Sequence, residues 1–144
     1  MDVGFFFWPY DPALTVRMAE SADRFGYDMI GIADTPGNAM DPWVAATLAA
    51  QRVKRARVAL CVTNLASRHP AVSAAAIASL DLLAPDRTVL GLGAGHSGTI
   101  NLGIRKSTSD ELEPGIDFIR ALLSKEAVAG PDGGSAQIPW VRHR

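Results

Sequence analysis

One local pattern occurs four times along the chain: a short, uniformly apolar run followed by a helix-forming segment. Asp11-Pro12 and Asp41-Pro42 stand at two of the junctions, and Pro70 stands at a third. Aspartate is a favoured helix cap and proline suits the first helical position, so a helix is expected to begin at each junction. Apolar strands that alternate with helices predict a parallel sheet covered by those helices.

The predicted strands are residues 3–7, 29–33, 58–62 and 88–92, and the predicted helices are residues 12–25, 42–53, 70–83 and 109–124. Thr108 and Glu111 form a predicted capping box for the last helix. Residues 125–144 are expected to be an irregular tail with a basic end. The apolar spacing predicts the buried helix faces, which are Leu14, Met18, Ala22 and Phe25; Val44 and Leu48; Ala76, Leu80 and Leu83; and Leu112, Ile116, Ile119 and Leu123.

Two architectures suit such units, a doubly wound sheet and a (β/α)8 barrel. Gly93-Ala94-Gly95-His96-Ser97-Gly98 matches the G-x-G-x-x-G pattern of dinucleotide-binding sheets, which requires a helix directly after the glycines. Residues 99–107 are instead expected to intervene without a helix. A complete barrel takes about 250 residues, and this chain has 144. We therefore predict an α/β fold: the first half, about four βα units, of a TIM (β/α)8 barrel, with residues 1–144 forming a single partial barrel domain.

Composition narrows the classes of partner. A formal net charge of −1 gives no electrostatic reason to expect nucleic acid or an anionic membrane surface. The apolar run 5–8 is far too short to span a membrane. Cys61 is the only cysteine, which excludes an internal disulfide, and His69, His96 and His143 lack metal-ligand spacing. We expect a cytoplasmic protein with no metal.

Polar groups and glycines stand where the predicted strands end: Trp8, Asp34, Thr63-Asn64 and the run from Gly93 to Ser97. In a parallel α/β fold these positions lie on one rim. Glycines let the backbone come close to a ligand and amides can bond ring atoms, so the rim suits a planar, polar cofactor. Purely structural interpretations also stand at this point. Asp34 could cap the turn before Pro36, Asn64 could satisfy loop backbone, and His96 could be a surface histidine.

Short motifs follow one another along the chain: residues 19–28, Val62-Thr63-Asn64 with Arg68-His69-Pro70, residues 80–87 and 90–95, Leu102-Gly103, and residues 111–113. In this order they resemble the luciferase-like monooxygenase superfamily, and most closely its coenzyme F420-dependent, methylenetetrahydromethanopterin reductase-like branch. The resemblance extends to about residue 140.

The resemblance implies a barrel that binds reduced F420, or alternatively FMN, at its C-terminal rim. It implies a non-prolyl cis peptide near Cys61 to Thr63. The site residues it implies are Asp34 and His96 as catalytic residues; Val62, Thr63, Asn64, Gly93, Ala94, Gly95, His96 and Ser97 as cofactor-binding residues; and Phe7 and Trp8 in the substrate pocket.

The leading functional hypothesis is an oxidoreductase that transfers a hydride from reduced F420 to a small electrophilic substrate, such as an imine, iminium or activated alkene. An FMN-dependent monooxygenase on the same fold is an alternative, and so is a truncated, non-catalytic half-barrel that needs a partner. Four βα units leave sheet edges and the inner wall open. We therefore expect a small-molecule substrate together with a homo-oligomer or a complementary half-barrel.

Overall fold

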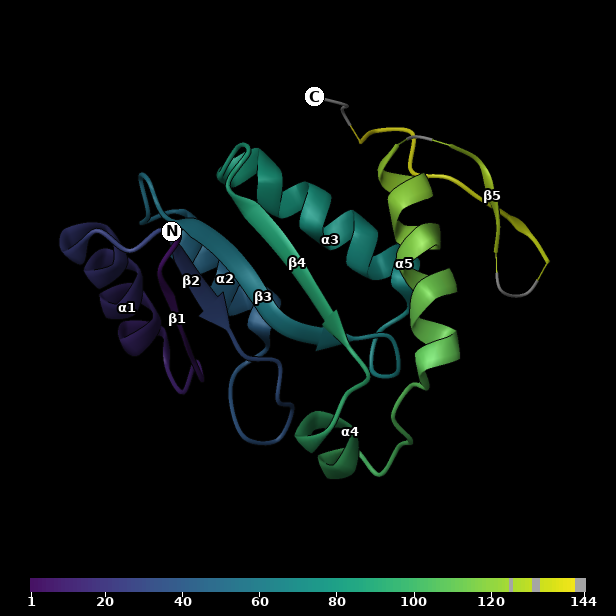
Figure 1. The fold of residues 1–144 in the computed structure, drawn as a ribbon, viewed down its shortest axis with the longest axis horizontal. Helices are drawn as coiled ribbons and strands as arrows, with labels where there is room; N and C mark the ends of the chain where they lie inside the picture. The colour runs from purple at the N-terminus through teal and green to yellow at the C-terminus, as the bar shows by residue number, and fades with distance from the viewer. Residues whose placement is uncertain (125, 131–132, 142–144) are drawn as a thin grey trace.

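A computed structural model describes residues 1–124, 126–130 and 133–141. Its centre is a parallel sheet in which the strands pair in chain order, β1-β2-β3-β4 (Figure 1). The strands are β1 (Gly4–Phe7), β2 (Met29–Ile32), β3 (Arg57–Asn64) and β4 (Thr88–Gly93), and the helices are α1 (Pro12–Phe25), α2 (Pro42–Ala50), α3 (Pro70–Leu83), α4 (Ser97–Asn101) and α5 (Ser109–Leu123).

The strand order distinguishes between the doubly wound sheet and the (β/α)8 barrel. A dinucleotide-binding sheet places its fourth strand beside the first, in the order 3-2-1-4. Here each strand pairs with the next one along the chain, as in a (β/α)8 barrel. The expected half-barrel is therefore confirmed. The expectation that no helix follows the glycines was wrong, because α4 begins at Ser97.

Helix starts follow the capping chemistry that the sequence indicates. The Asp11 carboxylate accepts from the Leu14 N–H at 2.7 Å, and the Asp41 carboxylate accepts from the Trp43 N–H at 2.9 Å. At α5, the Thr108 N–H donates to the Glu111 carboxylate at 2.8 Å, as half of the predicted capping box. Each of these bonds satisfies an N–H that a helix terminus would otherwise leave unpaired.

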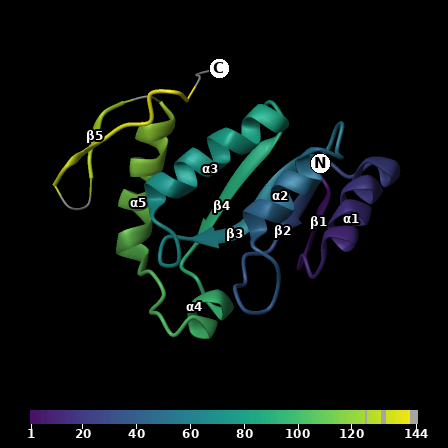
Figure 2. The same cartoon turned by 180° about the vertical axis from the view of Figure 1, so that it is seen from behind.

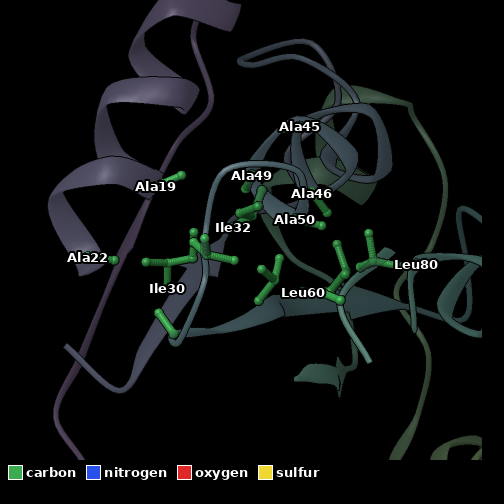
Figure 3. Close-up of a cluster of buried hydrophobic side chains, with 14 of the residues drawn as sticks. Ala19, Ala22, Ile30, Ile32, Ala45, Ala46, Ala49, Ala50, Leu60 and Leu80 are labelled. Atoms are coloured by element: carbon green, nitrogen blue, oxygen red, sulfur yellow. The ribbon is translucent and has the colours of Figure 1, made fainter. Parts of the chain in front are cut away.

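The main core lies between one face of the sheet and the helices. Figures 1 and 2 show the molecule from opposite sides, with α2 and α3 behind the sheet in one view and in front of it in the other. Ile30 and Ile32 of β2 and Leu60 of β3 are fully buried in this core, and Figure 3 shows them facing small side chains of α1 and α2. Those small side chains are Ala19, Ala22, Ala45, Ala46, Ala49 and Ala50.

Three predicted core positions are corrected by this packing. Phe25, Val44 and Leu83 are exposed, because alanines occupy the helix faces that meet the sheet and α2 can thereby approach it closely.

Element bounds also differ: β3 continues to Asn64, two residues beyond the prediction, and α2 ends at Ala50. The predicted tail contains the antiparallel strands β5 (Val128–Ala129) and β6 (Ser135–Ala136). Its basic end, residues 142–144, lies outside the described residues.

The opposite face of the sheet carries no helix of the described chain. Phe6 and Val62 project on this side and are about half exposed, and Gly31, Gly91 and Gly93 share the face with them. A Cβ added at Gly93 would lie 2.9 Å from a Val62 methyl, so the glycines make room for that valine. No helix in the described residues is long and apolar enough to cross a membrane.

Candidate functional site

The C-terminal ends of the four strands surround a hollow of about 350 Å³. This volume lies within the range of ordinary small-molecule pockets, roughly 300–1,000 Å³. The arrowheads of β3 and β4 end near α4, at the same end of the sheet (Figure 1). We refer to this feature as the rim hollow, and its lining residues are Phe6, Trp8, Ala33, Asp34, Thr35, Cys61, Val62, Asn64, Gly93, Ala94, Gly95, His96, Ser97 and Gly98.

A larger hollow of about 420 Å³ lies elsewhere, between α3, α5 and the segment that contains Trp140. It is lined by residues near the start of β4, including Thr88, and by Asp81 of α3. Chemistry in (β/α)8 enzymes takes place at the opposite, C-terminal face of the strands. We therefore place the candidate active site at the rim hollow, despite its smaller volume.

Asp34 follows β2 and is the only carboxylate that lines the rim hollow. Its Oδ2 accepts a hydrogen bond of 2.6 Å from the Thr63 hydroxyl, while its Oδ1 has no hydrogen bond to the described residues. Burial raises the pKa of Asp34 above its ordinary value, and the Thr63 hydrogen bond opposes that rise. Asp41 adds to the rise, whereas Arg68 counters it. The carboxyl group is thus half-buried, held at one oxygen and available at the other.

The two polar residues that end β3 turn their side chains into the protein. Thr63 is fully buried, and Asn64 is nearly so. The Asn64 amide oxygen accepts from the Ala66 N–H at 3.0 Å and from the Ser67 N–H at 2.8 Å. The loop-satisfying interpretation of Asn64 therefore holds for its oxygen, whereas Asp34 bonds to Thr63 in place of capping the turn before Pro36.

The aromatic wall of the rim hollow comes from β1. Phe6 and Trp8 lie edge to face with their ring centroids 5.1 Å apart, and the Trp8 indole N–H donates to the Thr35 hydroxyl at 3.3 Å. Phe7, which the sequence placed in the substrate pocket beside Trp8, lies in the core beneath the helices. Successive strand side chains point to opposite faces, so Phe6 replaces Phe7 in the wall.

The glycine-rich turn after β4 closes the rim hollow against α4. Gly95 has φ +87°, in the left-handed region, and a Cβ there would lie 2.6 Å from a Thr99 methyl. A Cβ at Gly98 would lie 2.9 Å from Pro36 Cδ, so α4 packs directly on the loop that carries Asp34. His96 and Ser97 lie exposed at the mouth, as the surface interpretation of His96 expects, with their Nδ1 and Oγ atoms 3.4 Å apart.

The expected cis peptide is present between Cys61 and Val62. The pairing of β3 with β4 shifts register between Leu60 and Thr63, which is the irregularity of a β-bulge. This bulge turns Val62 toward the open face of the sheet and sends Thr63 inward toward Asp34.

The rim hollow is uneven in charge. Among the described residues, its lining contains one carboxylate and one imidazole and neither lysine nor arginine. The described residues also contain no group of three or more His, Cys, Asp or Glu side chains placed to hold a metal. The arrangement suits a flat, largely uncharged ring system that meets an aromatic wall on one side and backbone amides of the glycine turn on another.

The sequence pattern of the luciferase-like monooxygenase family matches residues 9–132. The chain belongs to this family. Among the relatives of this luciferase-like chain is the 5,10-methylenetetrahydromethanopterin reductase of Methanolobus tindarius, which is 31% identical over 131 residues; the match covers 89% of the chain and 40% of the reductase. The F420-dependent hydroxymycolic acid dehydrogenase of Mycobacterium tuberculosis is 31% identical over 127 residues, covering 79% of the chain and 35% of that protein.

A solved structure agrees with the fold. The oxygenating constituent of the 3,6-diketocamphane monooxygenase of Pseudomonas putida, in complex with FMN, superposes with a TM-score of 0.79 at 24% identity. The match covers 94% of this luciferase-like chain and 43% of that structure. The chain thus spans less than half the length of the relatives it matches, in agreement with four βα units of an eight-unit barrel.

Proposed function

We propose that this luciferase-like chain forms the ring-binding side of an F420-dependent oxidoreductase site that reduces a small electrophilic substrate. The observation that carries the proposal is the rim hollow, which joins the aromatic pair Phe6 and Trp8, the carboxyl group of Asp34 and the glycine turn 93–95. A flat aromatic ligand packs favourably on the Phe6–Trp8 pair, and Asp34 and the glycine turn supply polar contacts at the edge of that ligand.

The lining fits a deazaflavin ring better than it fits a phosphate group. The lining that the described residues form contains neither lysine nor arginine to pair with an anionic tail, whereas backbone amides beside the glycines can bond ring carbonyl groups. When bound, a reduced deazaflavin would supply a hydride. Val62, Gly93, Ala94 and Gly95 would then contact the ring, and His96 and Ser97 would lie at its edge.

Asp34 is the side chain best placed to move a proton in this scheme. Asp34 lines the rim hollow and its Oδ1 has no hydrogen bond to the described residues, while its raised pKa keeps a larger share of the carboxyl group protonated near neutral pH than an ordinary aspartate would have. His96 is the second candidate, from the exposed mouth. A substrate between Trp8 and Asp34 would lie within reach of that proton.

A direct binding measurement tests which cofactor the chain binds. We expect oxidised F420 to bind the chain with a dissociation constant in the range of tens of micromolar or tighter, measured by fluorescence titration, with FMN titrated in parallel. The F420-dependent dehydrogenase among the relatives favours F420, whereas FMN dependence would be the alternative on the same fold. Binding of FMN alone would replace the F420 proposal with the monooxygenase, and binding of neither would refute both.

The uncovered inner face favours a second proposal, that a polypeptide carrying the remaining barrel units covers this face. Phe6, Trp8 and Val62 are 54%, 39% and 49% exposed on this face, and the β4 edge has no strand partner in the described residues. Contiguous apolar surface of this kind is uncommon on soluble monomers. Light scattering is expected to show self-association, with binding of a hydrophobic dye. A monodisperse monomer that does not bind the dye would contradict this proposal.

A further inference from the structure

We propose that Thr63 is a positioning residue that holds the Asp34 carboxyl group with one oxygen fixed and the other presented to the rim hollow. This inference deepens the proposed function and rests on it. It also separates Thr63 from the ring-contacting role that its place in the sequence suggested, because the hydroxyl is used within the protein.

The geometry that supports this role is the position of the Thr63 hydroxyl beside one of the two carboxyl oxygens of Asp34. Thr63 is fully buried and its hydroxyl lies 2.6 Å from Asp34 Oδ2. Thr63 pairs with Leu92 directly after the bulge in β3, so its backbone is held by the sheet on a strand that does not carry Asp34. Side chains anchored on rigid strands hold geometry better than side chains on loops. The Thr63 hydrogen bond therefore ties the loop that carries Asp34 to β3.

The hydrogen bond also decides which oxygen carries the proton. Thr63 donates to Oδ2 whether the carboxyl group is ionised or neutral, because its buried hydroxyl proton has no other acceptor among the described residues. The proton of the neutral acid therefore resides on Oδ1, the oxygen without a hydrogen bond to the described residues. If bound reduced F420 gave a hydride to the substrate carbon and was thereby oxidised, this proton would pass to the neighbouring atom, which would receive the electron pair of the broken π bond. Asp34 is left ionised and regains its proton from water.

The charged groups near Asp34 do not replace this hydrogen bond. Asp41 raises the pKa of Asp34 and Arg68 lowers it, but Arg68 forms its ion pair with Asp41 at 3.9 Å. The Arg68 guanidinium lies over the Trp43 ring, 5.2 Å from its centroid. His96 and Cys61 are the other titratable groups of the rim hollow, and no hydrogen bond joins either of them to Asp34 in the described part of the chain. Thr63 is thus the direct neighbour that fixes the carboxyl group.

Titration of Asp34 by carbon NMR in chain labelled at the aspartate carboxyl groups tests the proposal without any cofactor. The signal is assigned with Asp34→Asn. Thr63→Val removes the hydroxyl and keeps the shape, and we expect it to move the Asp34 titration to higher pH, because the ionised form loses its donor. Thr63→Ser restores a hydroxyl and is expected to titrate as the wild type does. Thr63→Ala carries the same expectation as Thr63→Val and replaces it if the valine variant does not fold.

Thr15→Val is the matched control. Thr15 is also fully buried, but its hydroxyl donates to the Asp11 backbone carbonyl at 3.0 Å on α1, away from the rim hollow. It is expected to leave the Asp34 titration unchanged. An unshifted titration in Thr63→Val, or a shifted one in Thr63→Ser, would overturn the positioning role. Because the titration needs no cofactor, failure of F420 to bind would instead count against the proposed function alone.

A kinetic measurement extends the test if F420 binds. We expect Thr63→Val to lower kcat about tenfold, because a loosened proton donor loses part of the usual gain from general acid catalysis, roughly 10²–10⁴-fold. The KM for substrate is expected to change less than about twofold, since Thr63 is buried and is not among the residues that line the rim hollow. A rise in KM as large as the expected loss in kcat, with kcat itself unchanged, would contradict the positioning role.

Discussion

Replacing Leu60 with alanine is expected to lower the free energy of unfolding by about 2–5 kcal/mol. Leu60 is fully buried at the centre of β3, between α2 and α3, where Figure 3 shows it close to Leu80 and Ala46. Truncation removes apolar contact and leaves a cavity, because the backbones that surround the site are tied into the sheet on both sides. Denaturant unfolding followed by circular dichroism measures the change.

Leu82→Ala supplies a control of the same chemistry at an exposed position. Leu82 lies on α3 and is 60% exposed, so its truncation is expected to change the free energy of unfolding by less than about 0.5 kcal/mol. A loss for Leu60→Ala no larger than that for Leu82→Ala would mean that the core between the sheet and the helices does not dominate stability. The comparison holds whether or not the chain binds a cofactor.

The arrangement of strands and helices could be read from the sequence because each junction carries its own local signal. Asp11, Asp41 and Pro70 act within one helical turn, and their capping and first-turn roles need no knowledge of distant residues. Gathering the strand ends on one rim then follows from parallel pairing. For this reason the sequence alone could predict that Trp8, Asp34 and Asn64 lie together.

Side-chain direction at the rim could not be predicted in the same way. The β-bulge between Leu60 and Thr63 breaks the alternation of β3 and sends Thr63 toward Asp34, and no local pattern in the sequence encodes it. Helix α4 is too short for a periodic signal, and it is held by its packing on Pro36. Phe6 could have been found: strand alternation makes Phe6 and Phe7 alternatives, and only one of them can join the core.

Buried helix faces were mispredicted for a related physical reason. The largest apolar residues were expected to point inward, but α2 presents Ala45, Ala46, Ala49 and Ala50 to the sheet and leaves Val44 in solvent. Small side chains permit close packing of helix on sheet, and a ranking by hydrophobicity does not capture that preference. The fold class survived these errors because strand pairing, rather than helix rotation, determines it.

Asp34→Asn is expected to lower the rate of substrate reduction by reduced F420 by about 10²–10⁴-fold, the usual contribution of a general acid. Asparagine keeps the shape and still offers an oxygen to the Thr63 hydroxyl, so the rim hollow and its affinity for F420 are expected to persist. Stopped-flow measurement of F420 oxidation, with a cyclic imine or an activated alkene as acceptor, reports the rate. Fluorescence titration reports the binding separately.

The pH dependence of the wild-type rate identifies the side chain that donates the proton. A proton donor is active below its pKa, so the rate is expected to fall as pH rises through the raised pKa of Asp34, and Asp34→Asn is expected to lose that fall. Asp117→Asn is the matched control, because Asp117 is exposed on α5 and, among the described residues, bonds only Arg120. A loss below about tenfold in Asp34→Asn, with the pH profile retained, would move the proton-donor role to His96 or to water.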